Sequence, residues 1–209
     1  MLADFIILNI LRPIIHLLCR IFFKIKFYGV ENIPSSGPVI IAPNHVSYLD
    51  PVLAAVPVNR RVYFMTWDRL FDLPAFSQLI QFLGAFPVKL EGGDRRATNR
   101  ARQLLEEGKV LMIFPEGGRS RDGRLMLFKS GGMRLAVESG AAVVPTTIKG
   151  AFEAWPAHKK LPRPNRITIT YHKPIMAAPT SGELEPSEIK LRAKVLAQQA
   201  QDCIARSLD

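Results

Sequence analysis

A chain of 209 residues, 48% of them hydrophobic, is long enough for one domain with a sizeable core. Its two cysteines, Cys19 and Cys203, lie far apart in sequence, which argues against a disulfide scaffold and a cysteine-based metal site and favours a reducing compartment. The formal net charge of +10 points to a polyanionic partner, either nucleic acid or an anionic membrane.

The first 26 residues form an apolar segment that favours the membrane. Arg12-Pro13 interrupts the segment, and Arg20, Lys24 and Lys26 follow. A spanning helix needs about 20 mostly apolar residues, and an arginine at mid-bilayer costs at least ~2.5 kcal/mol. Proline also removes a helical hydrogen bond. The pattern predicts a kinked or two-part helix that lies in the membrane interface, with its basic residues toward the headgroups.

Three other interpretations of residues 1–26 stay open. A short spanning anchor is the second choice. A cleaved signal peptide is disfavoured, because Asp4 stands where a basic start is usual and no convincing small-residue cleavage site follows. A buried core helix is disfavoured by the basic residues that follow the apolar run.

Apolar, β-rich runs alternate with helical stretches in the remaining chain, residues 27–209. The expected strands are 39–42, 61–65, 110–114, 142–148 and 167–171. The expected helices are 51–56, 75–83, 94–107, 132–139 and an amphipathic C-terminal helix over about 187–207. This alternation predicts an α/β fold: a single layered domain with a mixed, largely parallel sheet flanked by helices.

Two polar motifs each follow an expected strand. The first is Asn44-His45-Val46-Ser47-Tyr48-Leu49-Asp50, and the second is Phe114-Pro115-Glu116-Gly117-Gly118-Arg119-Ser120. In open α/β sheets, ligands gather outside the carboxyl ends of strands. We therefore expect both motifs to face one cleft.

His45 and Asp50 have the chemistry of a general base and its orienting carboxylate. Histidine titrates near neutral pH and can take a proton from an attacking hydroxyl, and a carboxylate on the far ring nitrogen fixes its tautomer. Asp50 also precedes Pro51, so it has a competing interpretation as the N-cap of the next helix. A histidine five positions before an aspartate is weak evidence by itself.

The second motif has the composition of an anion site. Gly117 and Gly118 permit positive φ and outward-pointing amides, and Arg119 can hold two phosphate oxygens. Glu116 is expected to orient Arg119 or a neighbouring backbone group, or to bind a glycerol hydroxyl. Lys129 contacts phosphate or is a plain surface lysine.

Together these motifs resemble the blocks of the lysophospholipid acyltransferase family, over about residues 27–175. His45 and Asp50 match its His-x4-Asp box, and 114–120 matches its Phe-Pro-Glu-Gly-Thr-Arg-Ser block with Gly118 in place of threonine. Phe-Lys-x-Gly at 128–131 and Val-Pro-Thr at 144–146 match the blocks that follow. The block at 84–88 normally ends in an arginine where this chain has Leu90, so Lys89, Arg95 or Arg96 would supply the charge.

The resemblance implies an acyltransferase that moves a fatty acyl group from acyl-CoA or acyl carrier protein to 1-acylglycerol 3-phosphate, giving phosphatidic acid. His45 and Asp50 would be catalytic. The residues expected to bind substrate are Glu116, Gly117, Gly118, Arg119, Lys129 and Lys89. No cofactor or metal is expected, because a thiol leaves readily without a covalent enzyme intermediate.

The implied partners are a lysophospholipid acceptor, the thioester donor and an anionic membrane surface at the cytoplasmic face of the cell membrane. Three alternatives remain: another lysolipid or glycerol phosphate as acceptor, a non-catalytic lipid-binding protein of the same fold, and a nucleic-acid-binding protein. The last rests on charge alone, since no nucleic-acid motif accompanies the basic residues, and no nucleic-acid partner is expected.

Overall fold

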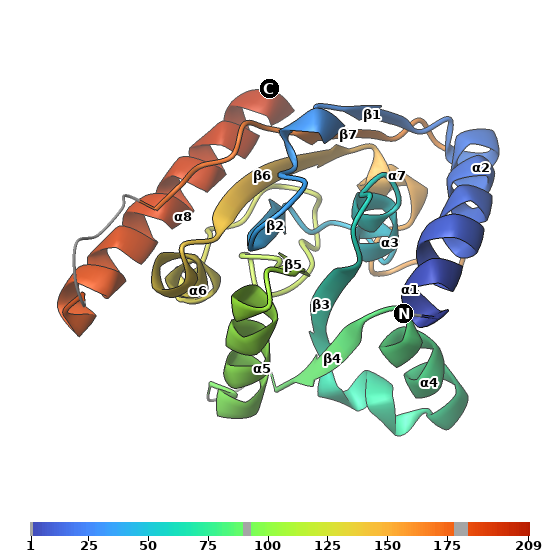
Figure 1. Cartoon of the computed structure of the whole chain (residues 1–209). Coiled ribbons are helices and arrows are strands. Elements are labelled where there is room, and N and C mark those ends of the chain that lie inside the picture. Colours follow the sequence, from blue (N-terminus) through green and yellow to red (C-terminus); the bar gives the residue numbers. More distant parts are fainter. Residues whose placement is uncertain (1, 90–92, 178–183) are drawn as a thin grey trace.

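The computed structural model of the chain describes residues 2–89, 93–177 and 184–209 (Figure 1). Its helices are α1 Leu2–Ile6, η1 Ile7–Leu11, α2 Arg12–Phe23, η2 Val30–Asn32, α3 Asp50–Ala55, η3 Asp68–Asp72, α4 Pro74–Phe82, α5 Arg95–Glu106, α6 Gly131–Ser139, α7 Ala151–Ala154 and α8 Pro186–Leu208. Its strands are β1 Lys26–Tyr28, β2 Val39–Pro43, β3 Val62–Trp67, β4 Ala85–Val88, β5 Val110–Met112, β6 Ala142–Lys149 and β7 Thr168–Tyr171.

The strands form one seven-stranded sheet in the order β1-β7-β6-β2-β5-β3-β4. Every neighbouring pair is parallel except β6 and β7, so the predicted mixed, largely parallel α/β sheet is confirmed. The pattern missed β1 and β4, which both lie at sheet edges. β1 has only three residues and begins with Lys26, and β4 contains Pro87, which an edge strand tolerates because one side needs no ladder hydrogen bond.

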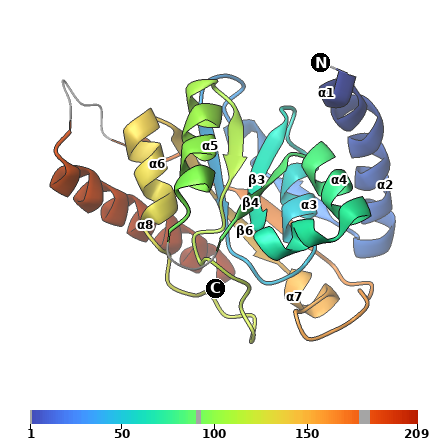
Figure 2. The same ribbon diagram turned by 90° about the horizontal axis from the view of Figure 1, so that it is seen from below.

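Helices cover both faces of the sheet, as Figures 1 and 2 show. Along β2, Val39 and Ile41 pack with Leu53 of α3 and the end of α2, whereas Ile40 and Ala42 pack with α5, α6 and α8. Successive side chains of a strand point to opposite faces, so a strand buried on both faces has no polar position. The five buried residues of β2 explain why 39–42 is a continuous apolar run.

The N-terminal helical segment runs from Leu2 to Phe23 and widens to a π-helix at Ile7–Leu11. Pro13 cannot donate a hydrogen bond, and its ring displaces the carbonyl of Asn9 four residues earlier, which accounts for the wide turn. The segment continues without a gap from Leu2 to Phe23, so a widened turn stands where a kinked or two-part helix was predicted. The helix ends at Lys24, whose φ is +45°, and β1 begins at Lys26, the last residue of the segment 1–26.

This helix packs along the α/β domain. Cys19 and Phe23 are buried in the core, Arg12 Nη1 donates to the Val58 carbonyl at 2.9 Å, and Arg61 pairs with Asp4 at 2.5 Å. Leu2–Phe23 is long and apolar enough to cross a membrane, a test that core helices and signal sequences also pass, yet only 6% of its apolar window is buried. Most of its apolar surface therefore faces outward.

Candidate active site

The two motifs meet at the carboxyl ends of β2 and β5, which are neighbours in the sheet. The backbone N–H of His45 donates to Glu116 Oε1 at 2.6 Å, and the Ser120 N–H donates to the His45 carbonyl at 2.8 Å. Both backbone polar groups of the histidine are thus held by the second motif. The two motifs therefore lie side by side at one edge of the sheet, and the shared cleft expected for them stays a prediction.

His45 and Asp50 are in direct contact. His45 Nδ1 lies 2.8 Å from Asp50 Oδ2, and the carboxylate is completely buried. An ionised carboxylate only accepts hydrogen bonds, so Nδ1 carries the ring proton and Nε2 presents a lone pair. No described residue hydrogen-bonds Nε2, and the side chain keeps 16% of its surface exposed. The imidazole is therefore oriented to accept a proton at Nε2.

Asp50 also holds the loop that carries His45. Its Oδ2 accepts the N–H groups of Val46 and Ser47, each at 2.7 Å. The competing interpretation of Asp50 as an N-cap is wrong: Leu49 is the N-cap, and Asp50 is the first residue of α3 with its carboxylate turned back to the preceding loop. A carboxylate pointed at amides three and four residues earlier cannot also reach the next turn of the helix.

The ring of Phe114 packs against one face of the His45 imidazole. The two rings stack with centroids 4.0 Å apart and planes 25° apart. Asn44 fixes the chain just before the histidine, because its side chain exchanges two hydrogen bonds with the backbone of Ile148 in β6. His45 is therefore held by its ring, its backbone and the preceding residue.

Glu116 is buried and accepts two backbone hydrogen bonds, from His45 N–H at 2.6 Å and from Met126 N–H at 3.0 Å. Of the roles expected for it, orientation of neighbouring backbone is the one its contacts fit. Burial raises the pKa of its carboxyl to about 7, and the charge of Asp50 acts in the same direction against the two amides.

The raised pKa of Glu116 gives a stability prediction. A carboxyl whose folded pKa lies above its ordinary 4.5 contributes stability that is complete below pH 4.5 and is lost as the pH rises through about 7. We expect this contribution to be on the order of 2–3 kcal/mol. Urea unfolding from pH 5 to 8 measures it, and in Glu116→Gln the fall with pH should disappear. An exposed-site control, Glu106→Gln, should keep it; an unchanged slope in Glu116→Gln contradicts the assignment.

The glycines differ in their roles. Gly117 has φ +75°, and a Cβ there would lie 2.6 Å from the ammonium of Lys129, so this position needs glycine. Gly118 has no positive φ, and a Cβ there would meet nothing within 4 Å. The expectation that both glycines use positive φ is wrong for Gly118, which explains how the family's usual threonine can occupy this position.

Lys129 closes the loop after the second motif. Its N–H donates to the Pro115 carbonyl at 2.8 Å, and its side chain runs over Gly117. The ammonium therefore adds positive charge directly beside the Gly117-Gly118-Arg119 turn.

Arg119 lies over the ring of Tyr48, with its guanidinium carbon 3.6 Å from the ring centroid. Its Nη1 is buried and has no hydrogen-bond partner among the described residues. Tyr48 in turn contacts Trp155 at 5.3 Å between centroids. The arginine is thus held on the first motif by a cation–π contact, and its buried Nη1 is left without an acceptor among the described residues.

Tyr48 and Trp155 are residues that sequence reasoning missed. Tyr48 lies inside the first motif, but nothing in its identity or spacing indicates an arginine 71 positions later. Trp155 enters the site through the fold alone, because its carbonyl accepts from Ser47 Oγ at 2.8 Å. This hydrogen bond ties the first motif to the chain after β6.

Lys89 follows β4 at the same carboxyl edge of the sheet, three strands from β2. At about 4.8 Å per strand this places it roughly 14 Å from the histidine loop. Its N–H donates to Asp94, which caps α5, and Arg95 and Arg96 form the first turn of that helix. Leu90 lies outside the described residues. No group of three or more His, Cys, Asp or Glu residues able to hold a metal ion occurs in the described part of the chain.

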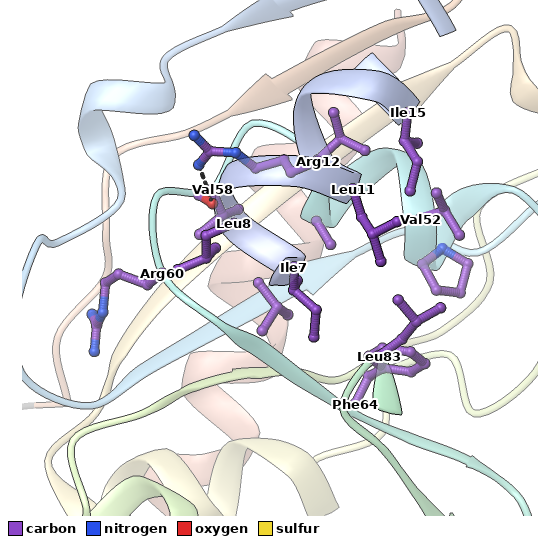
Figure 3. A pocket seen from close by; sticks show the side chains of 14 residues that line it. Ile7, Leu8, Leu11, Arg12, Ile15, Val52, Val58, Arg60, Phe64 and Leu83 are labelled. Carbon is purple, nitrogen blue, oxygen red and sulfur yellow. Dashed lines mark hydrogen bonds between the residues drawn. The ribbon is translucent and has the colours of Figure 1, made fainter. Parts of the chain in front are cut away.

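An apolar cleft begins immediately beyond Asp50. It contains about 600 Å³ of space, part of it open to solvent, and lies between the N-terminal helix, α3, β3 and the turn before β4. Figure 3 shows Ile7, Leu11 and Val52 turned into it, with Leu83 and Phe64 at one end, while Arg12 turns its guanidinium to the Val58 carbonyl. Twelve of its fourteen lining residues are apolar, and the other two, Arg12 and Arg60, lie at its margin.

Comparison with known proteins gives concordant matches. Residues 24–149 match the family model described as Acyltransferase. The chloroplastic 1-acyl-sn-glycerol-3-phosphate acyltransferase LPAT1 of Arabidopsis thaliana is 31% identical over 90% of this chain and 50% of its own length. A 1-acyl-sn-glycerol-3-phosphate acyltransferase of Borreliella burgdorferi is 29% identical over 60% of this chain and 51% of its own.

Among solved structures, the 1-acyl-sn-glycerophosphate acyltransferase PlsC of Thermotoga maritima superposes with a TM-score of 0.68. It is 24% identical, and the match covers 93% of this chain and 81% of that one. This likeness supports the fold. The chain spans about half the length of the chloroplastic relatives it matches.

Proposed function

The chain belongs to the acyltransferase family, and from this premise we propose that it transfers a fatty acyl group from a thioester to the free hydroxyl of 1-acylglycerol 3-phosphate, giving phosphatidic acid. The observation that carries the proposal is the direct joining of the two motifs. Asp50 orients His45, and Glu116 and Ser120 hold its backbone beside the Arg119 turn. The proposed base, His45, and the proposed anion-binding turn at Arg119 are therefore held next to each other by hydrogen bonds between their loops.

In the proposed reaction, His45 Nε2 accepts the proton of the acceptor hydroxyl as its oxygen attacks the thioester carbonyl. Asp50 stabilises the imidazolium that forms. The carbon–sulfur bond then breaks, and the imidazolium returns the proton to the departing thiolate. Acyl-CoA or acyl carrier protein supplies the same thioester chemistry. The chain's own residues orient the base and bind the acceptor, and no covalent enzyme intermediate is needed.

The acceptor's phosphate would be bound by Arg119 and the adjacent Gly117-Gly118 turn, with Lys129 adding charge. The unpartnered Nη1 of Arg119 supports this assignment, because a buried guanidinium nitrogen is costly without an acceptor. The chloroplastic and Borreliella burgdorferi relatives are named 1-acyl-sn-glycerol-3-phosphate acyltransferases, which supports 1-acylglycerol 3-phosphate as the acceptor.

The apolar cleft is suited to an acyl chain. Pro51 and Val52, which directly follow Asp50 in the sequence, belong to its lining, so the cleft includes the start of the helix that Asp50 begins. Burying each methylene of a chain in such a cleft contributes about 0.8 kcal/mol. We propose that one acyl chain lies there during transfer.

Arg119→Ala tests the phosphate assignment. Hydrogen bonds to charged groups contribute about 1.5–3 kcal/mol, so the KM for lysophosphatidic acid should rise about 10–100-fold. The KM for monoacylglycerol, which lacks the phosphate, should change little. Arg124→Ala is the matched control, because Arg124 lies in the same loop with an exposed side chain, and it should leave both values unchanged. An unchanged KM for lysophosphatidic acid in Arg119→Ala would argue against the role.

For localisation, we propose that Leu2–Phe23 lies in the membrane interface at the cytoplasmic face. The helix is fixed to the domain by the Arg12–Val58 and Asp4–Arg61 contacts, and a spanning helix would have to break both. Lys24 and Lys26 at its end favour anionic headgroups. The cytoplasmic side follows from the proposed donor, since thioesters of CoA and carrier protein are intracellular metabolites.

A further inference from the structure

Helix α4 exposes its apolar stripe to solvent instead of burying it against the domain. Leu73, Phe76 and Leu79 follow one another at helical spacing and are 58%, 42% and 51% exposed. The buried face carries Ser77 and Ile80. A helix of a soluble domain normally buries its apolar stripe, so an apolar stripe that faces outward indicates contact with an apolar medium or partner.

The apolar surface continues before α4. Trp67 and Leu70 are exposed in and before η3, and the guanidinium of Arg69 lies over the Trp67 ring, 5.2 Å from its centroid. Tryptophan and arginine are typical of the headgroup level of a membrane, where one side of the group is apolar and the other is polar.

The same surface adjoins the N-terminal helix. Arg61 joins them, because its guanidinium pairs with Asp4 of α1 and donates to the carbonyl of Phe82 at the end of α4. Figures 1 and 2 both place α4 beside the N-terminal end of that helix. Large apolar side chains are exposed along the helix, including Leu2, Phe5, Ile14, Leu17 and Ile21.

We propose that residues 67–79 form a second membrane-docking element that inserts into the interface of a lipid bilayer beside the N-terminal helix. A bilayer fits better than a protein partner because the adjoining helix is apolar enough for a membrane and is only 6% buried, and because the Trp67–Arg69 pair suits the headgroup region. The net charge of +10 favours anionic lipid.

This element also orients the molecule. η3 follows β3 at the carboxyl edge of the sheet, the edge at which His45 follows β2. Docking through residues 67–79 therefore turns the candidate active site toward the lipid. The inference goes beyond the proposed function, since docking would hold even if the chain transferred no acyl group.

Flotation of the full chain with vesicles of equal parts phosphatidylcholine and phosphatidylglycerol tests the proposal. In the double variant Phe76→Ser, Leu79→Ser, the partition coefficient should fall about 30-fold, because two half-exposed apolar side chains no longer enter the bilayer. The matched control is Leu191→Ser, Val195→Ser, which removes exposed apolar side chains from α8 on the other side of the sheet. It should bind as the unmodified chain does.

A second variant keeps the test decisive if the serine pair unfolds α4. In Phe76→Trp, brominated phosphatidylcholine chains should quench the added fluorescence. Unchanged flotation of a folded serine variant, or no added quenching in Phe76→Trp, would overturn the proposal. Light scattering without vesicles covers the alternative of a second copy: a dimer that becomes monomeric in the serine variant, with vesicle binding unchanged, would also overturn it. None of these readouts needs turnover.

Discussion

Replacing His45 with alanine is expected to lower turnover about 10²–10⁴-fold, the range typical of a lost general base. The reason is geometric: Asp50 holds the protonated Nδ1 at 2.8 Å, which leaves Nε2 as the proton acceptor. His45→Gln should be equally inactive, because an amide can bond Asp50 but cannot take up a proton. Thiol release from an acyl thioester at saturating lysophosphatidic acid measures the effect.

The control for this prediction is His158→Ala, which removes an exposed histidine after α7 and should keep normal turnover. Circular dichroism should show an unchanged fold in all three variants. A folded His45→Ala protein that retains more than about a tenth of normal turnover would contradict the role of the base.

Replacing Asp50 with alanine is expected to impair both stability and turnover. The change leaves the buried N–H groups of Val46 and Ser47 without an acceptor and removes the anchor of His45. Each orphaned amide costs about 1–3 kcal/mol, so the free energy of unfolding should fall by about 3–5 kcal/mol. Turnover should fall about 10²–10⁴-fold, because the histidine loses its fixed orientation.

Asp50→Asn separates the two effects. Its carbonyl oxygen can still accept from Val46 and Ser47, so urea unfolding should show a smaller loss of stability than in the alanine variant. Turnover should nevertheless remain low, because a neutral amide does not stabilise the imidazolium. Asp202→Asn, on the exposed face of α8, is the control and should change neither quantity. Normal turnover in Asp50→Asn would show that the carboxylate serves the loop alone.

The fold could be predicted because its central elements have strong local signals. The runs that became β2 and β5 are buried on both faces and therefore read as unbroken apolar segments, and β6 begins with such a run before its two buried threonines. β1 and β4 could not be predicted, because a three-residue strand beginning with Lys26 and a strand containing Pro87 depend on their neighbours for identity. An edge strand of this kind forms because the neighbouring strand pairs with it, and its own residues do not predict it.

The site was predictable where residues share a motif and not where the fold joins distant ones. The expected sheet edge brings His45 and Glu116 together, but the bond from Glu116 to the histidine's backbone, and its second bond to Met126, depend on loop conformation. The stacking of Arg119 on Tyr48 is likewise a tertiary contact. The outward apolar face of α4 was missed because sequence periodicity shows that a stripe exists and not which way it faces.

Acceptor-dependent thiol release by the purified chain in detergent tests the central claim most directly. Palmitoyl-CoA and palmitoyl acyl carrier protein would each be supplied with lysophosphatidic acid, with lysophosphatidylcholine, and with no acceptor. The proposed function predicts release that requires lysophosphatidic acid and is accompanied by phosphatidic acid. Equal thiol release without an acceptor would indicate a thioesterase. No thiol release with either donor would contradict the assignment of acyl transfer.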